Sequence, residues 1–152
     1  MTPVTLKQLN EATQQGQGEF YVDGQLLNNI VVVGMVMKAE RNMNALFFEV
    51  EDGTGRMSVK LWLDAEDESR EEFSIAPFTY VKVYGHFRIF SEKKSINAFK
   101  MTIIKDHNEI TTHILECIYT HLYHINGANQ INYLKLVAIH PIHTKVMNWI
   151  SC

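Results

Sequence analysis

The hydrophobic pattern predicts five β-strands between residues 30 and 105. The run Ile30–Met37 is continuously apolar and rich in β-branched residues, as in a strand that is covered on both faces. From Leu46 to Glu51 every second position is apolar, which is the period of a half-buried strand. Met57–Leu63, Tyr80–Phe90 and Ser95–Lys105 complete the series. Alternating faces of this kind predict a small β-protein.

The connections between these strands favour a closed barrel. Asp52–Arg56 predicts a hairpin turn, because its glycines can adopt positive φ, and Gly34 predicts a bulge or sharp bend. Asp64–Phe78 is acidic and predicts a solvated connector with one helical turn around Ser69–Phe73. Closure of five strands removes exposed edges, and the oligonucleotide-binding (OB) fold is such a barrel. A four-stranded sheet with packed helices is the competing architecture, but only one convincing helix is available to cover it.

The segments on either side of the barrel divide the chain further. Thr5–Ala12 predicts a short helix or strand with Leu6 and Leu9 as its apolar contacts, and Gln14–Gly18 predicts a polar link. A helix is expected from Asp106, where Glu109 would complete a capping box. We therefore expect a leader (1–28), an OB-fold domain (29–105), an assembly helix (106–130) and a divergent apolar tail (131–152).

The predicted helix carries more apolar surface than a barrel needs. One seam has the heptad spacing Leu115, Ile118, Leu122 and Ile125. A second set of apolar side chains widens the stripe beside it: Ile110, Ile114 and Cys117. One stripe can pack on the barrel, so two adjacent stripes indicate a partner helix. The residues alone leave packing on the barrel and packing on a partner about equally favoured.

Two strands place aromatic and basic side chains on their outward faces. In Met57–Leu63 the period of two puts Lys60 and Trp62 opposite the apolar positions, together with Ser58. In Tyr80–Phe90 it directs Val81, Val83, Phe87 and Ile89 inward and these side chains outward: Lys82, Tyr84, His86, Arg88 and Phe90. Cations neutralise phosphates, and aromatic rings stack on bases of any sequence. The pattern favours a single-stranded nucleic acid, although an outward ring can also serve only in packing.

Composition and charge first oppose this interpretation and then support it. The 152 residues are 46% hydrophobic and 20% charged, which excludes wholesale disorder. No apolar run can cross a bilayer and Met1–Asn10 lacks a signal peptide, so we expect a soluble intracellular protein with no membrane association. The net charge of −3 argues mildly against a nucleic-acid partner. Residues 79–105, however, carry six basic residues against Glu92 alone. The local charge there is strongly positive, and Lys93 and Lys94 lie in a loop that OB folds use to hold oligonucleotides.

The sequence gives little support for metal binding, a cofactor or catalysis. Cys117 and Cys152 have no metal-ligand spacing, and His113, His121 and His124 fit ordinary polar positions on one helix, so we expect no metal and no cofactor. A phosphate-binding glycine loop and a nucleophile elbow are both missing from the sequence. We therefore expect no enzymatic activity.

Five stretches, in order, resemble the middle subunits of replication protein A, the eukaryotic heterotrimer that coats single-stranded DNA. They are VTLKQL, IVVVGMV, VEDGTGRMSVKLW, YVKVYGHFRIFSEKKSINAFK and DHNEITTHILE, and the resemblance as a whole covers roughly residues 4–130. The resemblance implies an OB fold and a helix that joins a three-helix bundle with the large and small subunits. It implies a nuclear protein of DNA replication, repair and recombination, and it places stacking aromatics at Trp62 and Phe90. Arg88, Lys60, Lys93 and Lys94 are our own inference for the phosphate contacts.

The chain departs from that family at both ends. Family members usually begin with a phosphorylatable Gly/Ser-rich tail and end in a winged-helix domain, whereas here the core starts almost at Met1 and an apolar stretch follows the helix. We therefore do not expect damage-dependent regulation through an N-terminal tail or recruitment of repair proteins through a winged helix. A telomere-capping subunit with the same build and a purely structural assembly subunit are the alternative functions.

Overall fold

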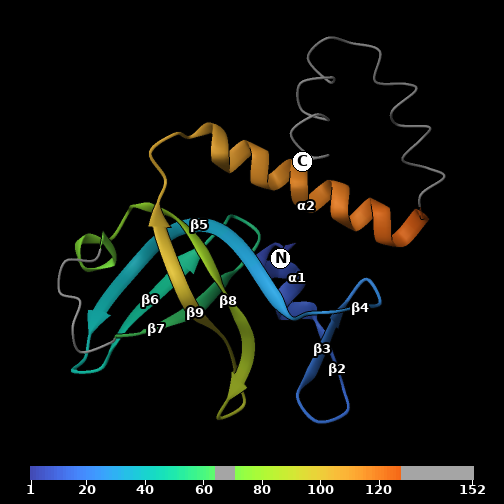
Figure 1. Cartoon of the computed structure of the whole chain (residues 1–152), viewed down its shortest axis with the longest axis horizontal. Helices are drawn as coiled ribbons and strands as arrows, with labels where there is room; N and C mark the ends of the chain where they lie inside the picture. Colours follow the sequence, from blue (N-terminus) through green and yellow to red (C-terminus); the bar gives the residue numbers. More distant parts are fainter. Residues whose placement is uncertain (64–70, 128–152) are drawn as a thin grey trace.

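The computed structural model describes residues 1–63 and 71–127, and its centre is a closed five-stranded barrel (Figure 1). The strands are β5 (Asn29–Arg41), β6 (Ala45–Glu51), β7 (Arg56–Trp62), β8 (Tyr80–Phe90) and β9 (Lys93–Ile103). They follow the order β5-β6-β7-β9-β8, and pairing of β5 with β8 closes the barrel. The β7–β9 pair is parallel and the others are antiparallel. The predicted OB barrel is confirmed.

Strand β5 is long enough to pair with both of its neighbours. It pairs with β8 as far as Met35 and with β6 from Met35 onward. At the changeover, a Cβ on Gly34 would lie 2.6 Å from Cγ1 of Val50, so only glycine lets the two strands approach this closely. The irregularity in pairing lies between Val36 and Lys38, beyond the glycine. Gly34 thus marks the predicted bend, and the bulge follows it.

Burial of side chains in the barrel core confirms the predicted alternation of inward and outward residues in β7 and in most of β8. Met57, Val59 and Leu61 of β7 are buried, as are Val81 and Val83 of β8. Ser58 and Trp62, on the other face of β7, are exposed and Lys60 is half-buried. Burial of the apolar face fixes the register, because a slip of one residue would turn every side chain to the opposite face.

The leader contains strands that the hydrophobic pattern did not predict. It contains β1 (Thr2–Pro3), α1 (Leu6–Glu11), β2 (Thr13–Gln15), β3 (Glu19–Val22) and β4 (Gln25–Leu26). Strand β1 pairs in parallel with β5, and β2, β3 and β4 form a separate antiparallel sheet. The predicted link at Gln14–Gly18 is therefore wrong at its start, because Gln14 and Gln15 pair with residues of β3.

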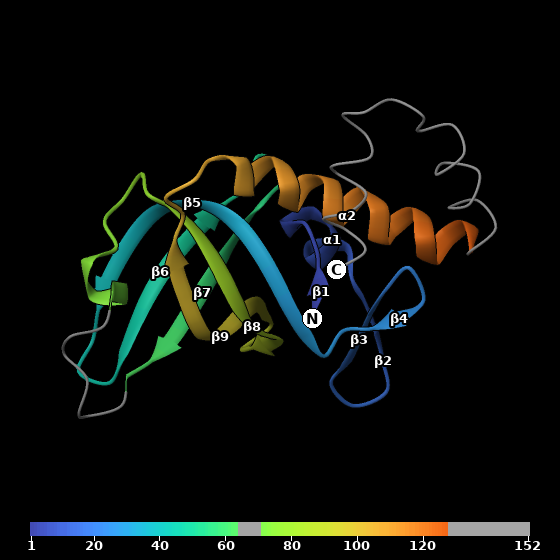
Figure 2. The ribbon, with the colours of Figure 1, turned by 45° about the horizontal axis from the view of Figure 1, so that its top comes forward.

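Helix α1 closes one end of the barrel, so the segment predicted near Thr5 as a short helix or strand is a helix. Thr5 and Gln8 form a capping box, and the N–H of Leu6 donates to Oδ2 of Asp52 in the β6–β7 turn at 2.8 Å. Leu6 and Leu9 are fully buried. The short 3₁₀ helix η1 (Glu71–Ser74) lies at the opposite end of the barrel (Figure 2).

Helix α2 (Asn108–Asn126) crosses the barrel beside β1 and β5 (Figures 1 and 2). The predicted start and capping box are wrong, because His107 is the N-cap residue and its side chain makes no capping bond. Oδ1 of Asp106 accepts a hydrogen bond from the N–H of Asn108 at 2.9 Å instead. Residues 128–130 of the predicted segment and the tail 131–152 lie outside the described residues. Among the described helices, none is long and apolar enough to span a membrane.

Candidate nucleic-acid interface

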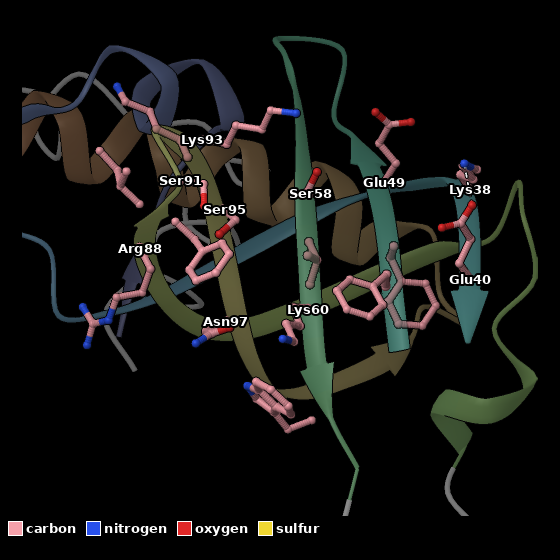
Figure 3. A pocket seen from close by; sticks show the side chains of 17 residues that line it. Lys38, Glu40, Glu49, Ser58, Lys60, Arg88, Ser91, Lys93, Ser95 and Asn97 are labelled. Atoms are coloured by element: carbon pink, nitrogen blue, oxygen red, sulfur yellow. Dashed lines mark ion pairs between the residues drawn. The ribbon is translucent and has the colours of Figure 1, made fainter. Parts of the chain in front are cut away.

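A groove of about 880 Å³ crosses the outer face of the barrel. Its floor is formed by outward side chains of β5, β6, β7 and β9, and the β8–β9 hairpin forms one end (Figure 3). Arg88 and Lys93 lie at the hairpin end, whereas Lys38 and Glu40 lie at the opposite end. An open, elongated channel of this kind can hold a polymer along its length.

Strand register brings the predicted DNA-binding residues of β7, β8 and β9 to one surface. Ser58 of β7 pairs with Ser95 of β9, which pairs with Arg88 of β8. One row further along, Lys60 pairs with Asn97. Because paired residues in adjacent strands point to the same side, these side chains share the floor of the groove. All six predicted DNA-binding residues line it.

Two large aromatic rings in the groove are open to solvent. Trp62 is 54% exposed and Phe90 is 79% exposed. Rings of this size bury much apolar surface when they find a partner, so exposure of two in one groove indicates a binding surface. Both are the positions at which the family resemblance implies stacking.

The cations differ in what they contact. Nζ of Lys60 lies 3.5 Å from the centroid of the Trp62 ring, in a cation–π contact. Arg88 and Lys93 are exposed, and Nη1 of Arg88 donates to the carbonyl of Phe87 at 3.2 Å. Nζ of Lys94 donates to the carbonyl oxygens of Asn10 and Ala12, at 2.5 Å and 3.3 Å. Lys94 thus holds the end of α1 against β9, a structural role that its loop position did not reveal.

The far end of the groove contains residues that were not predicted as part of a site. Phe47 and Glu49 of β6 line it together with Lys38 and Glu40 of β5. Nζ of Lys38 pairs with Oε1 of Glu40 at 2.5 Å, so the two side chains together carry no net charge. The available signal was the strand alternation, which places Phe47 and Glu49 opposite the buried Phe48.

The outward face of β8 is divided between two surfaces. Arg88 and Phe90 reach the groove, but Lys82 and Tyr84 pair with Val33 and Val31 of β5 on another side of the barrel. There Nζ of Lys82 lies 5.8 Å from the centroid of the Tyr84 ring. The basic segment found in the sequence therefore serves two surfaces, because a long strand coils around the barrel.

The predicted inward position of Ile89 is wrong. Its side chain is 39% exposed and lines the groove. Ile89 pairs with Lys94 in the last rungs of the β8–β9 hairpin, next to the turn at Ser91 and Glu92. The barrel core does not extend to these rungs, so alternation there no longer separates core from solvent.

Helix α2 divides its apolar side chains between the barrel and solvent. Cys117 is buried, whereas Ile114 and Ile118 are each 50% exposed and Ile125 is 56% exposed. The remaining predicted interface residues are half-buried: Ile110, Leu115 and Leu122. Cys117 therefore belongs to the contact with the barrel, and the exposed stripe is formed by its neighbours.

His113 is not the ordinary polar position that the sequence predicts. It is 4% exposed, and its Nε2 lies 3.3 Å from the carbonyl oxygen of Val4 and 3.4 Å from Sγ of Cys117. Burial lowers the pKa of His113 to about 4 and raises the pKa of the Cys117 thiol to about 12, so both groups are neutral at pH 7. Further along, Nδ1 of His121 lies 2.7 Å from Oδ2 of Asp23. The helix is thus held to the leader by polar contacts.

Comparison with known proteins points to one family. Residues 30–104 match the model of an OB-fold nucleic acid binding domain. The chain is 37% identical over 123 residues to the replication protein A 32 kDa subunit of Rattus norvegicus, covering 80% of this chain and 45% of that protein. It is 37% identical over 135 residues to replication factor A protein 2 of Schizosaccharomyces pombe, covering 87% and 46%. The chain thus spans about half the length of the curated relatives it matches.

Solved structures agree with the sequence relatives. A chain in a replication protein A heterotrimer bound to ssDNA superposes with a TM-score of 0.72 at 35% identity, covering 81% of this chain and 96% of that one. The S. pombe Stn1-Ten1 complex gives a TM-score of 0.70 at 17% identity, covering 78% and 88%, which shows the shared fold alone. From the shared motifs, the barrel-plus-helix fold and these identities, the chain belongs to the family of replication protein A 32 kDa subunits.

Proposed function

We propose that this chain is a non-enzymatic single-stranded DNA-binding and assembly subunit of a replication protein A-type complex. It acts in the nucleus, in DNA replication, repair and recombination. The groove is the DNA contact, and the exposed face of α2 is the contact with the other subunits. The observation that carries the DNA contact is the pair of exposed rings, Trp62 and Phe90, with Lys60, Arg88 and Lys93 in the same groove.

The chemistry of the groove supports this ligand. A base stacked on an exposed ring contributes roughly 1–3 kcal/mol and needs no particular sequence, because every base has a π-face. Lysine and arginine beside the rings displace counterions from the phosphates. Relatives of known structure include a replication protein A heterotrimer and yeast RPA, both bound to ssDNA. With two exposed rings and few free cations, the groove is suited to a modest contribution within a larger DNA-binding assembly.

The exposed stripe of α2 supports the assembly role. We propose that it joins a three-helix bundle with the large and small subunits. Ile114, Ile118 and Ile125 present branched apolar side chains to solvent at helical spacing, and Leu115 and Leu122 flank them. This is the residue type and spacing with which helices interlock side chains in bundles.

Paired substitutions in the groove test the DNA contact. Trp62→Ala with Phe90→Ala should weaken oligonucleotide binding by the reconstituted complex by at least tenfold, since two stacking platforms are lost. Subunit assembly, followed by size-exclusion chromatography, should not change. The matched control is Tyr84→Ala, which removes an aromatic ring from the other surface of β8 and should leave binding intact. Unchanged DNA affinity and crosslinking in the double variant would leave a purely structural subunit as the function.

Mass spectrometry of endogenous partners distinguishes the remaining alternative. Large and small replication protein A subunits are the expected partners. Recovery of telomere-capping proteins in their place would assign the chain to a replication protein A-like telomere complex.

A further inference from the structure

A third aromatic ring, Phe47, lies in the groove beyond the two that the family resemblance implies. Phe47 is on β6, where it pairs with Glu40 of β5 on one side and with Lys60 of β7 on the other. Its side chain is half-buried and lines the groove. The partly open ring has no role in the core, which is filled from the opposite face by Phe48. Its position therefore needs an explanation in terms of the groove.

The ammonium of Lys60 lies close to two rings at once. Its Nζ is 3.5 Å from the centroid of Trp62 and 5.2 Å from the centroid of Phe47. The two rings are therefore closer together than the sum of these distances. Neighbouring nucleotides can match such a spacing, because stacked bases of one strand are about 3.4 Å apart along the axis and a single strand can extend further.

This ammonium occupies the surface that a base would use. At 3.5 Å from the Trp62 centroid it covers one ring face, so a base can stack on that face only after the ammonium has moved. A cation–π contact at a solvent-open site is worth about 0.5–1 kcal/mol, which is less than a base stack gains. An incoming strand also brings phosphates, to which a released ammonium can bind.

The charges around Phe47 restrict what can lie there. Glu49 and Glu40 line this end of the groove, and Lys38 is paired with Glu40. Phosphates would be repelled by this end, whereas an uncharged base would not be. Arg88 and Lys93, which pair with no carboxylate among the described residues, lie at the hairpin end (Figure 3). Along the groove, aromatic surface thus extends further than positive charge.

We propose that Phe47 is a third base-stacking position, which holds the last base of the strand in the groove, and that Lys60 moves from the two rings to a phosphate when DNA binds. The backbone of the strand then follows the cations near the β8–β9 hairpin, and the last base in the groove reaches the acidic end, with the next phosphate outside the groove. This proposal rests on the proposed DNA-binding function of the same groove.

Oligonucleotide length tests the role of Phe47. The full chain, as Phe47→Leu and as Phe47→Tyr, is titrated with oligodeoxythymidines of two to eight nucleotides. In the wild type and in Phe47→Tyr, which keeps the ring, affinity should rise until the last base reaches position 47. In Phe47→Leu the rise should stop one nucleotide earlier, and the longer oligonucleotides should bind roughly five- to a hundredfold more weakly.

Each other outcome overturns the proposal. An equal loss at every length would give Phe47 a structural role, and no loss at any length would remove it from the binding surface. In both cases Trp62→Ala with Phe90→Ala shows whether the groove itself binds DNA, so failure of this proposal is distinguishable from failure of the proposed function.

Salt dependence tests the movement of Lys60. If its ammonium reaches a phosphate in the complex, Lys60→Met should reduce the slope of log affinity against log salt by about 0.7, the contribution of one phosphate contact on a single strand. An unchanged slope would show that Lys60 stays with the rings, and would overturn this part of the proposal.

Discussion

The groove and the outer face of α2 both expose large apolar side chains, but their surroundings differ. In the groove, Trp62 and Phe90 are accompanied by Lys60, Arg88 and Lys93. On α2, isoleucines are exposed to a similar extent, and the sequence from 106 to 126 contains no lysine or arginine. Exposed apolar area alone does not identify a ligand. The charge beside it separates a surface suited to a polyanion from one suited to another helix.

Two charges placed in the α2 stripe should have the largest effect. Ile118→Asp with Leu122→Asp puts carboxylates where a partner helix would bury them, and burial of an unpaired charge costs several kcal/mol. We expect complete loss of co-purification with the large and small subunits. Asn108→Asp with Asn126→Asp adds the same charge at exposed ends of the helix and is the matched control. A trimer retained by the stripe variant would contradict the proposed bundle.

The stability contributed by the barrel-facing side of α2 should fall as the pH is lowered, because His113 is buried there. Because burial lowers the pKa of His113 from 6.5 to about 4, the unfolded chain binds a proton first as pH falls. Stability from this residue is complete above pH 6.5, and roughly 3 kcal/mol of it should be lost on acidification to pH 4. Chemical denaturation at several pH values measures this loss. The comparison variant, His113→Gln, cannot titrate and should lack this part of the pH dependence, so equal curves for both proteins would refute the assignment.

Two lysines of β9 should separate the groove from the rest of the basic segment. Lys93 lies in the groove, whereas Lys100 lies near Tyr84, on the other surface. Lys93→Met should lower the salt slope of DNA binding by about 0.7, and Lys100→Met should leave it unchanged. Affinity measured at four or more salt concentrations gives both slopes. Equal slopes for the two variants would mean that the whole segment, rather than the groove, attracts DNA.

Much of the barrel and of the groove could be predicted from local sequence. A period of two is enough to separate Val59 and Leu61 from Lys60 and Trp62, because one face of the strand must be buried. The alternation fails at Ile89, where the hairpin passes beyond the core. It also did not single out Phe47, because an aromatic residue between apolar neighbours has the same pattern whether it packs or binds.

The least predictable contacts are those made with the leader. Lys94 donates to the carbonyls of Asn10 and Ala12, and His113 contacts the carbonyl of Val4. Backbone carbonyls have no side-chain signature, and their position depends on how α1 and β1 pack on the barrel. The sequence therefore predicts a phosphate contact for Lys94 and an ordinary polar position for His113, and it shows no sign of these backbone contacts.

The fluorescence of Trp62 reports whether a DNA base stacks on this ring in the groove. The chain's other tryptophan, Trp149, is replaced by phenylalanine, so that Trp62 becomes the sole indole reporter. The protein is titrated with an oligodeoxythymidine whose binding is followed independently by anisotropy. We expect a saturable change in Trp62 emission that follows the binding curve, because a base replaces the Lys60 ammonium on the ring. Binding with no change in Trp62 emission would contradict base stacking on this ring.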